Sequence, residues 1–519
     1  MGIGDGGLVA ARPVVQDRNT RFDGGLNISA DPSQLAPNQV RRAENCRLTV
    51  FGGIIKRLGS RKIHPTALQT ASVVRAGFAW IKDDGTQQLL AVAAGKLHTA
   101  TYSSSVTWVT VSSTVTMTTS AYPSFVSFRD ATEAVVYIAD GGKLMKWNGT
   151  NLTRSTSSPN VTSIWLYNQR LYGVTGTDVI LLVSGINNGD DLGDASLDGA
   201  QFPIITFGES SLVNGVALGV MNLLFHKNGI SKFVGVTQDD IAIRAGTLGL
   251  SPDVGTIQPK SLLATETEAY FLSDRGFYAA NAYGVRRIST NLDPDILGLF
   301  TNADNLCVVH NRFYREVAWY LPNVGFYVYN YQAQAWVGPW NNGYVSPVTH
   351  CAWQAVDTAT SKPIVLVGDA AGYVKQMDYP NTYKDNVAST GSGGTTVTMT
   401  AQLRRLFFGN PASTKALRFL YALTNLSGAT NTAVAWSTQT YSGQTNLPLT
   451  SAGVWNATGA TWNSGAVWGA SGSDMFRVQA AGNGEFVDIS FTDSSTNAIP
   501  LLSAMTAEAY DYGQAHSFN

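Results

Sequence analysis

Four aspartates in one polar loop are the first residues that could do chemistry. The stretch 185–201, GINNGDDLGDASLDGAQ, contains Asp190, Asp191, Asp194 and Asp198. Calcium is a hard cation that takes several oxygen ligands, many of them carboxylates. The spacing matches no EF-hand loop and no closing Glu follows. We therefore favour a solvated insertion on one repeating unit over a calcium site, and we assign no metal ligand.

Motifs for catalysis and cofactor binding are missing from the sequence. The six histidines and three cysteines stand at no metal-ligand spacing, and there is no GxSxG elbow, P-loop or GxGxxG after a strand. The carboxylate pair of a glycosidase is a spatial arrangement that sequence does not reveal. Its candidates here are Glu266, Glu268, Asp274, Asp293 and Asp295. We predict no enzymatic activity, no catalytic residue and no cofactor, and a propeller glycosidase is kept as the less favoured alternative.

A basic cluster near the N-terminus is the candidate for partner docking. The block 36–65 contains seven cationic residues and a single acidic one, Glu44. The cationic residues are Arg41, Arg42, Arg47, Lys56, Arg57, Arg61 and Lys62. Such a cluster can face solvent, phosphate or an acidic protein. Docking to an acidic protein partner is the functional hypothesis, and a solvated face is the alternative.

Three tryptophans could stack on sugars. Trp455, Trp462 and Trp468 lie in Gly- and Asn-rich loops, as aromatic residues do in many carbohydrate-binding modules. Aromatic residues also commonly fill the ends of a β-sandwich or an interface. We favour the second interpretation, and a carbohydrate-binding adhesin stays open as an alternative function.

Composition narrows the class of protein. Of 519 residues, 44% are apolar and 14% charged, and the net charge is −1. Soluble domains usually carry about 25% charged residues, and a surface with few charges suits extensive subunit contacts. Nothing in the overall charge draws the chain to nucleic acid. The three scattered cysteines predict a protein that folds in the reducing cytosol. We expect no signal sequence. We also expect no membrane span, since no apolar run is long enough.

A recurring β-hairpin must position any site. In 137–150, YIADGGKLMKWNGT, an apolar strand, an Asp-Gly-Gly turn and an alternating strand follow one another. Asp-Gly between such runs is a strong hairpin signal, because Gly adopts positive φ without steric cost. The pattern recurs at 90–102, 223–235, 269–281, 318–331 and 363–378, with a weaker copy at 170–183.

The spacing of these hairpins predicts the architecture. Most steps between their turn glycines are about 47 to 53 residues, and one is about 34. Such periods, built from short strands, are typical of β-propeller blades, which pack on their neighbours to bury their faces. We predict an all-β chain with a propeller-like body of five to seven blades at 70–385.

Two further domains are expected to flank this body. Six short alternating runs follow a Gly/Ser/Thr linker and predict a C-terminal β-sandwich at 386–519. The runs are 397–408, 416–424, 433–437, 475–480, 486–492 and 504–510. Residues 1–69 are expected to form an N-terminal arm and docking segment. There, 1–35 would be extended and need a partner to be ordered, 38–45 a short helix, and 46–50 and 54–57 two strands.

The order of these features resembles a known family. FDGGLN at 22–27, PNQ at 37–39, AENC at 43–46 and GGIIKRLGSR at 52–61 are similar to the opening of the tail hub or nozzle proteins of short-tailed bacteriophages. These are also called tail accessory or packaged-DNA stabilisation proteins. KLMKW at 143–147, NQRLY at 168–172 and the terminal sandwich after a propeller-like body continue the likeness.

The resemblance implies a structural virion protein. Its six copies would form a ring below the portal or adaptor subunits, extend the DNA exit channel, and help to retain and then release the genome. Needle, spike or fibre proteins would bind at the sides or below, and DNA would pass without specific binding. The protein would be located in the virion tail, after assembly in the cytoplasm of the host bacterium.

Overall fold

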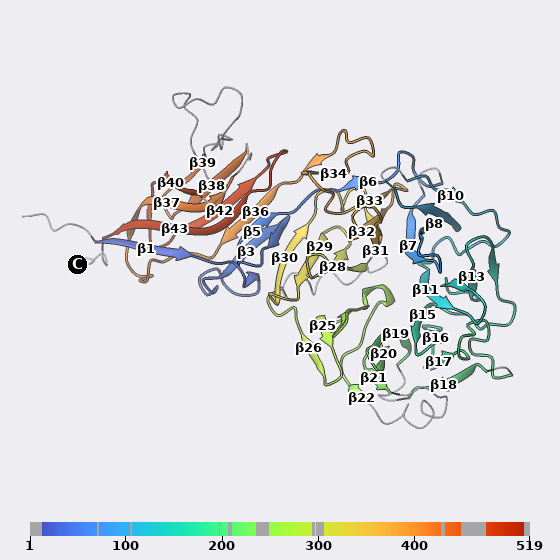
Figure 1. Cartoon of the computed structure of the whole chain (residues 1–519). Coiled ribbons are helices and arrows are strands. Elements are labelled where there is room, and N and C mark those ends of the chain that lie inside the picture. Colours follow the sequence, from blue (N-terminus) through green and yellow to red (C-terminus); the bar gives the residue numbers. More distant parts are fainter. Residues whose placement is uncertain are drawn as a thin grey trace, which may run out of the picture. The chain divides into compact units, whose positions relative to one another are not determined.

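The computed structural model of the chain describes residues 13–69, 72–103, 106–196, 198–205, 210–234, 249–292, 296, 306–426, 431–447 and 474–512. The elements with defined bounds in these ranges are strands, apart from the 3₁₀ helix η1 (Pro259–Ser261). No helix in this part of the chain is long and apolar enough to cross a membrane. The predicted all-β class is confirmed (Figure 1).

The described strands belong to two compact units. The propeller unit lies within residues 59–334 and 339–395, and the sandwich unit within 1–58, 335–338 and 396–519. The predicted N-terminal domain, 1–69, is therefore divided between the two units.

Six separate four-stranded antiparallel sheets are described in the body of the chain, and a further group of four antiparallel strands lies at 307–340. Each of these seven groups is one propeller blade. Blade 1 contains β7 (Val74–Ile81), β8 (Gln87–Ala93), β9 (Lys96–Thr101) and β10 (Val109–Thr110). Blade 2 contains β11 (Ser124–Arg129), β12 (Ala134–Ala139), β13 (Met145–Trp147) and β14 (Leu152–Arg154). Blade 3 contains β15 (Ser163–Tyr167), β16 (Arg170–Val174), β17 (Ile180–Val183) and β18 (Ala200–Pro203). Blade 4 contains β19 (Leu212–Leu218), β20 (Met221–His226), β21 (Ile230–Phe233) and β22 (Gly249–Ser251). Blade 5 contains β23 (Leu263–Ala264), β24 (Ala269–Ser273), β25 (Gly276–Ala280) and β26 (Val285–Arg287). Blade 6 is β27 (Cys307–Asn311), β28 (Glu316–Leu321), β29 (Gly325–Asn330) and β30 (Ala335–Trp340). Residues 335–338 of β30 are grouped with the sandwich unit.

Blade 7 closes the ring with a strand from the start of the unit. It contains β31 (Thr349–Asp357), β32 (Lys362–Asp369) and β33 (Val374–Gln376), and its outer strand is β6 (Arg61–Lys62). The pairing is antiparallel, with Lys375 opposite Lys62. The innermost strand of each blade contacts that of the next, and β31 contacts β7 of blade 1. Each predicted hairpin forms the second and third strands of one blade, so the propeller prediction is confirmed.

Adjacent blades share their hydrophobic cores, which is why one blade would not be stable alone. In one such core, Trp80 and Leu90 of blade 1 pack with Val136 and Trp147 of blade 2. Glycines on innermost strands make room for tryptophans of the preceding blade. A Cβ atom at Gly77 would collide with the Trp353 ring, and one at Gly215 would collide with the Trp165 ring.

The sandwich unit contains two mainly antiparallel sheets. One consists of β1 (Val14–Asn19), β4 (Cys46–Leu48), β5 (Ile54–Lys56), β37 (Lys415–Asn425), β40 (Asp474–Gln479), β41 (Asn483–Gly484) and β43 (Leu501–Asp511). The other contains β2 (Gly25–Leu26), β3 (Gln39–Glu44), β36 (Met399–Leu403), β38 (Thr432–Ser437), β39 (Ser442–Asn446) and β42 (Asp488–Asp493). All six predicted runs contain a strand. The linker region holds the short pair β34 (Lys384–Asp385) and β35 (Thr395–Thr396).

The N-terminal arm is already ordered by the chain itself from residue 13. Strand β1 pairs antiparallel with β43, with Val14 opposite Tyr510 and Asn19 opposite Met505. The expectation that residues 1–35 need another protein to be ordered is therefore wrong for 13–35. Residues 1–12 lie outside the described part of the chain.

The helix predicted at 38–45 is also wrong, because the segment is strand β3. The helix was expected because Pro37 is favourable at a first helical turn. Val40 and Ala43 are both buried, three residues apart. The register of β3 against β36 shifts between Val40 and Arg42. A bulge of this kind adds one residue and keeps both side chains on the same side of the sheet. The following strands, β4 and β5, are as predicted.

Candidate functional site

The innermost strands of the propeller unit enclose a cavity of about 810 Å³ around the propeller axis. All seven of these strands, or the residues just before them, contribute to its wall. Much of the wall is apolar, including Phe125, Ile164, Val216, Leu262 and Val308. This is the one described pocket to which every blade contributes, so the closed ring of blades creates it.

One end of this axial cavity is cationic. The Nζ atom of Lys260, on η1, lies 2.9 Å from the centroid of the Tyr122 ring, and the guanidinium carbon of Arg75 lies 4.9 Å from the same centroid. Nδ1 of His350 is 3.2 Å from the Tyr122 hydroxyl oxygen. We call Arg75, Tyr122, Lys260 and His350 the basic mouth.

The topology brings these four residues together. Each blade has four antiparallel strands, so all innermost strands run in the same direction. Arg75 is the second residue of β7 and His350 the second of β31, while Tyr122 and Lys260 come just before β11 and β23. All four therefore lie where innermost strands begin, at one end of the axis. Nδ2 of Asn214 donates to the Pro259 carbonyl at 2.9 Å and fixes the η1 turn that carries Lys260.

The two carboxylates described near this end already have cationic partners. Asp140 accepts from Arg154 at 3.1 Å and from the backbone amides of Thr118 and Gly142 at 3.0 Å each. Asp369 lies 2.8 Å from Lys375. Asp140 and Asp369 are thus each engaged by a cation outside the basic mouth.

The electrostatics of the basic mouth are visible in His350. Burial lowers the pKa of its imidazole to about 4, helped by Arg75 and Lys260 and opposed by Asp369. At neutral pH the ring is therefore uncharged, and Arg75 and Lys260 supply the positive charge.

The basic cluster predicted to dock a partner does not lie on one face. Arg41 and Arg42 are exposed on β3, and Arg42 pairs with Glu44 at 2.6 Å. Arg61 and Lys62 are half-buried on β6 of the propeller unit, where their side chains lie over the rings of Tyr379 and Tyr373. Arg47, Lys56 and Arg57 are almost fully buried within the sandwich unit. Only Arg41 and Arg42 are exposed, so the docking hypothesis narrows to them.

Burial of Lys56 and Arg57 has specific causes. Nζ of Lys56 donates to Oδ2 of Asp493 at 2.9 Å and to the Ser495 carbonyl at 2.6 Å. Nε of Arg57 donates to Oδ1 of Asn45 at 3.0 Å. A buried charge is tolerated when it is paired and hydrogen-bonded. These two cations therefore belong to the interior of the sandwich unit and do not form a docking surface.

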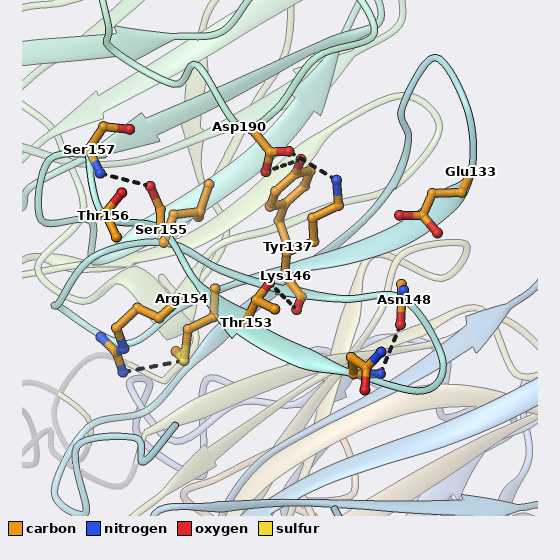
Figure 2. A pocket seen from close by; sticks show the side chains of 13 residues that line it. Glu133, Tyr137, Lys146, Asn148, Thr153, Arg154, Ser155, Thr156, Ser157 and Asp190 are labelled. Atoms are coloured by element: carbon orange, nitrogen blue, oxygen red, sulfur yellow. Dashed lines mark hydrogen bonds and ion pairs between the residues drawn. The ribbon is translucent and has the colours of Figure 1, made fainter. Parts of the chain in front are cut away.

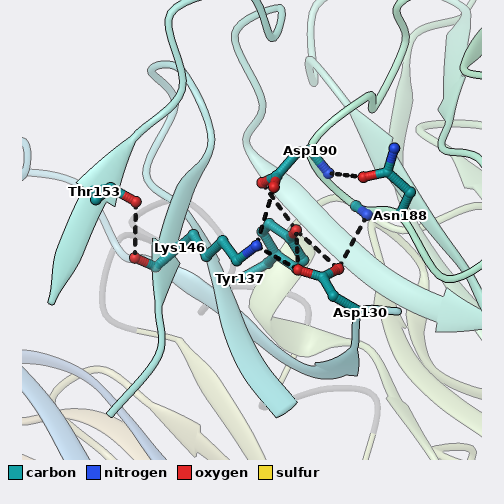
Figure 3. A network of polar contacts seen from close by, with 7 residues as sticks. Asp130, Tyr137, Lys146, Thr153, Asn188 and Asp190 are labelled. Atoms are coloured by element: carbon teal, nitrogen blue, oxygen red, sulfur yellow. Dashed lines mark hydrogen bonds and ion pairs between the residues drawn. The ribbon is translucent and has the colours of Figure 1, made fainter. Parts of the chain in front are cut away.

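The carboxylates of the loop 185–201 accept hydrogen bonds from other groups of the protein. Asp190 accepts from the Tyr137 hydroxyl and from Lys146, each at 3.0 Å, and Asp130 also contacts both (Figure 3). Asp130, Tyr137 and Lys146 belong to blade 2 and Asp190 to blade 3, so this network connects two blades. The pairs with Asp130 and Asp190 raise the pKa of Lys146 against the opposing effect of burial.

The other aspartates of the loop bond locally. Oδ1 of Asp191 accepts from the Gly185 amide at 2.8 Å, and Oδ1 of Asp194 accepts from the amide and hydroxyl of Ser196. Asp198 borders Gly185. No group of three or more His, Cys, Asp or Glu side chains suited to a metal ion occurs among the described residues.

A polar pocket of about 500 Å³ lies beside this network on blade 2 (Figure 2). Its wall includes Tyr137, Lys146, Arg154 and Asp190 together with serines, threonines and asparagines. Burial and the two aspartates raise the pKa of Tyr137, so its hydroxyl stays protonated. Lys146 is held between two carboxylates. The pocket can therefore offer hydrogen bonds, and none of these groups is poised for proton transfer.

Of the candidate carboxylates of a glycosidase, the structure describes Glu266, Glu268 and Asp274, and none of these three lines the axial cavity. Glu268 pairs with Arg286 at 2.8 Å, and Asp274 accepts from the Ser273 hydroxyl. Glu266 is mostly exposed. Asp293, Asp295 and the three tryptophans Trp455, Trp462 and Trp468 lie outside the described residues. Asp140 is the single carboxylate among the described residues lining the axial cavity.

Sequence reasoning missed the basic mouth. Its four residues are far apart in the chain and share no motif. Each of the four lies at or just before the start of the innermost strand of its blade. This position could have identified them, but only once the blade boundaries were known.

Cys307 and Cys351 also line the cavity. All three cysteines are buried and no disulfide joins them.

Comparisons with known proteins give no family. No protein-family model matches the sequence, and no curated protein matches it. Similar solved structures include the extracellular domain of a protein described as a hybrid two component system of B. thetaiotaomicron, at 10% identity and a TM-score of 0.43, covering 63% of this chain and 40% of that one. A second such domain from B. thetaiotaomicron has 12% identity and a TM-score of 0.40, covering 61% and 41%. The chain thus matches about two fifths of the length of these structures.

Proposed function

We propose that the chain is a structural subunit of the tail of a short-tailed bacteriophage. As a tail hub or nozzle protein, six copies would form a ring below the portal or adaptor subunits and extend the DNA exit channel. Needle, spike or fibre proteins would attach at the sides or below. The ring would help to retain the packaged genome and then release it.

The observation that carries this proposal is the structural role of the residues that resemble the family. Phe22 is fully buried, and Gly25 has φ +62°, where a Cβ atom would collide with the Trp336 backbone. A Cβ atom at Gly59 would collide with the Lys384 backbone. Arg57 is buried against Asn45. The resemblance therefore falls on positions where this fold restricts the residue type.

The remaining features agree with a structural role. Each blade packs on two others, which makes the propeller unit stiff. A channel formed by chains with a net charge of −1 would hold DNA phosphates weakly, because retention of phosphates requires many cationic contacts. The genome could then slide out once the exit opens.

The test is imaging of the parent particle with a specific antibody fragment bound. Label in a ring at a single capsid vertex, below the portal, would support the tail hub. Label on outlying fibres would favour an adhesin, and no label on any particle would refute both.

A carbohydrate-binding adhesin is the second candidate, and the polar pocket on blade 2 is the observation in its favour (Figure 2). Its serines, threonines, asparagines and Arg154 could donate hydrogen bonds to sugar hydroxyls. A glycan array with the full chain tests this: binding that is lost in Asn148→Ala/Asn151→Ala would support it, and silence would contradict it.

A further inference from the structure

We propose that one face of the sandwich unit binds an acidic segment of a partner protein, in which carboxylates are accompanied by aromatic side chains. This face belongs to the sheet that contains β1, β43, β37 and β40. Arg41 and Arg42 lie on β3 of the other sheet, so the two surfaces are different. The inference concerns the sandwich unit alone and does not depend on the proposed role in a virion.

The face is formed by outward side chains of these four neighbouring strands (Figure 1). On β43, Met505 and Ala507 are fully buried, so the residues that alternate with them point away from the core. Six exposed or half-buried side chains, which we call the arginine face, carry the argument. They are Arg18, Arg418, Phe419, Tyr421, Arg477 and Tyr510.

A β-bulge on β37 places two of these side chains next to each other. The register of β37 against β43 shifts between Leu417 and Phe419. In a bulge, two consecutive residues lie opposite one residue of the partner strand. Arg418 and Phe419 are accordingly both half-buried, while Leu417 before them and Leu420 after them are buried. The bulge therefore brings a cation and an aromatic ring to the same place on the face.

Guanidinium groups lie over the aromatic rings of the arginine face. The guanidinium carbon of Arg418 is 4.8 Å from the centroid of Phe419 and 5.1 Å from that of Tyr510. The guanidinium carbon of Arg477, on β40, is 4.7 Å from the Phe419 centroid. A ring attracts a cation without neutralising it, so both arginines can still bind carboxylates with paired hydrogen bonds.

This arrangement favours a protein carboxylate over a nucleic-acid base. Single-stranded nucleic acid binds largely by stacking its bases on open aromatic rings. Two guanidinium groups already lie over the Phe419 ring. The hydrogen-bonding edges of these groups, rather than the ring, are therefore what the face offers to a partner.

The described part of the arginine face has an excess of positive charge. Its three arginines are opposed by one described carboxylate on the same side of the sheet, Glu508, which Arg418 contacts at 3.2 Å. Arg18 and Arg477 form no ion pair among the described residues. Three positive charges against one negative charge leave a net charge of +2.

The undescribed stretches of the sandwich unit do not alter this balance. They contain one acidic residue and one arginine in total, and they are 1–12, 427–430, 448–473 and 513–519. A partner with carboxylates therefore complements the face in charge. Arginine and tyrosine are also among the residues that contribute most to the affinity of protein interfaces.

Fluorescence anisotropy with the full chain tests the proposal with three labelled probes. One is a peptide that repeats Glu-Trp-Gly four times, the second repeats Gln-Trp-Gly four times, and the third is an oligothymidylate of the same length. We expect saturable binding of the acidic peptide and weaker binding of the neutral one, because only the first supplies carboxylates. No saturable binding of the acidic peptide, equal affinity of the two peptides, or tighter binding of the oligothymidylate would each overturn the proposal.

The paired variants are Arg418→Gln/Arg477→Gln and, as a control with the same change in charge, Arg312→Gln/Lys362→Gln on the propeller unit. The first variant should bind the acidic peptide about tenfold more weakly or worse, since it loses both stacked cations. The control should bind as the native chain does. Equal affinities of the two variants would refute the assignment of the arginine face.

A second readout uses the native chain and does not depend on how well the variants fold. Met475 lies on β40, two residues before Arg477, and is 69% exposed. Hydroxyl radicals oxidise accessible methionines, so the bound acidic peptide should lower the oxidation of Met475 several-fold. Tyr283, which is 96% exposed on the propeller unit, should be modified as before. Undiminished oxidation of Met475 at saturation would place the peptide elsewhere and overturn the proposal.

Discussion

The Nζ atom of Lys56 lies 2.9 Å from Oδ2 of Asp493, and neither side chain has any exposed surface. Asp493 also accepts from the Thr432 hydroxyl at 2.7 Å and from the Ser495 amide at 3.0 Å. The pair thus joins β5, near the N-terminus, to β42, near the C-terminus. Removing one partner would leave an uncompensated buried charge.

The variant Lys56→Met should therefore destabilise the sandwich unit by about 3–5 kcal/mol. Hydrogen exchange of peptides from β5 and β42 measures the local opening free energy. Arg42→Ala breaks an exposed pair and is the control, with an expected cost below about 1 kcal/mol. The double variant Lys56→Met/Asp493→Leu should recover much of the loss, and a double variant as unstable as Lys56→Met would contradict the ion-pair explanation.

Docking of the chain to an acidic partner can be tested at the exposed end of the basic cluster. Arg41→Glu/Arg42→Glu should block incorporation into portal-bearing capsids, while the isolated chain keeps its thermal stability. Arg312→Glu/Lys362→Glu makes the same change in charge on the propeller unit and should incorporate normally. Quantitative immunoblotting of purified particles measures incorporation. Unimpaired incorporation of the first variant would refute the docking hypothesis.

Acid should destabilise the propeller unit through two histidines. Burial lowers the pKa of both His310 and His350 to about 4, with further lowering by Arg312 and Arg75 respectively. In the unfolded chain their pKa is about 6.5. Below 6.5 the unfolded state binds more protons, so stability is fully present above pH 6.5 and is lost as the pH falls towards 4.

The measurement is the midpoint of thermal unfolding between pH 7.5 and 4.5. His310→Gln/His350→Gln should flatten the decline, because it removes the groups that take up protons on unfolding. His98→Gln is a single-site comparison, since burial lowers its pKa too, and it should change the slope less. A double variant with the native slope would show that other groups govern the acid response.

The loop 185–201 should be held by its contacts with blade 2 rather than by a metal. Asp190→Ala removes the loop's carboxylate from Tyr137 and Lys146 and leaves them with Asp130 alone, so limited proteolysis should cut this loop several times faster. Asp194→Ala, whose side chain bonds only to Ser196 among the described contacts, is the matched control. Chelation by EDTA should leave the cleavage rate of the native chain unchanged, and acceleration by EDTA would favour the calcium alternative.

Much of the fold could be predicted because its signals are local. Each of the seven hairpins predicted from alternation and turn glycines lies in a different blade, and each C-terminal run contains a strand. The number of blades was not fixed, because the weak copy at 170–183 breaks the period. The insertion 185–201 between β17 and β18 lengthens the step that follows this copy, and it does not account for the short step before it.

The errors came from partners that are distant in sequence. Strand β1 looked unstructured because its partner β43 is almost the whole chain away. Pro37 indicated the start of a helix, because the pairing of β3 with the distant strand β36 was not visible. Lys56 and Arg57 were predicted to lie on the surface, because nothing in the neighbouring sequence showed that they pair with Asp493 and with the Asn45 side chain. The basic mouth was missed for the same reason.

The pairing of early with late strands has a consequence for synthesis on the ribosome. Blade 7 lacks its outer strand until β33 emerges to meet β6, which was translated more than 300 residues earlier. Strand β1 waits even longer for β43. Neither unit can therefore finish folding during most of translation, and the nascent chain exposes open sheet edges until its last strands are made. Chaperones that cover such edges should associate with the growing chain and leave soon after its release.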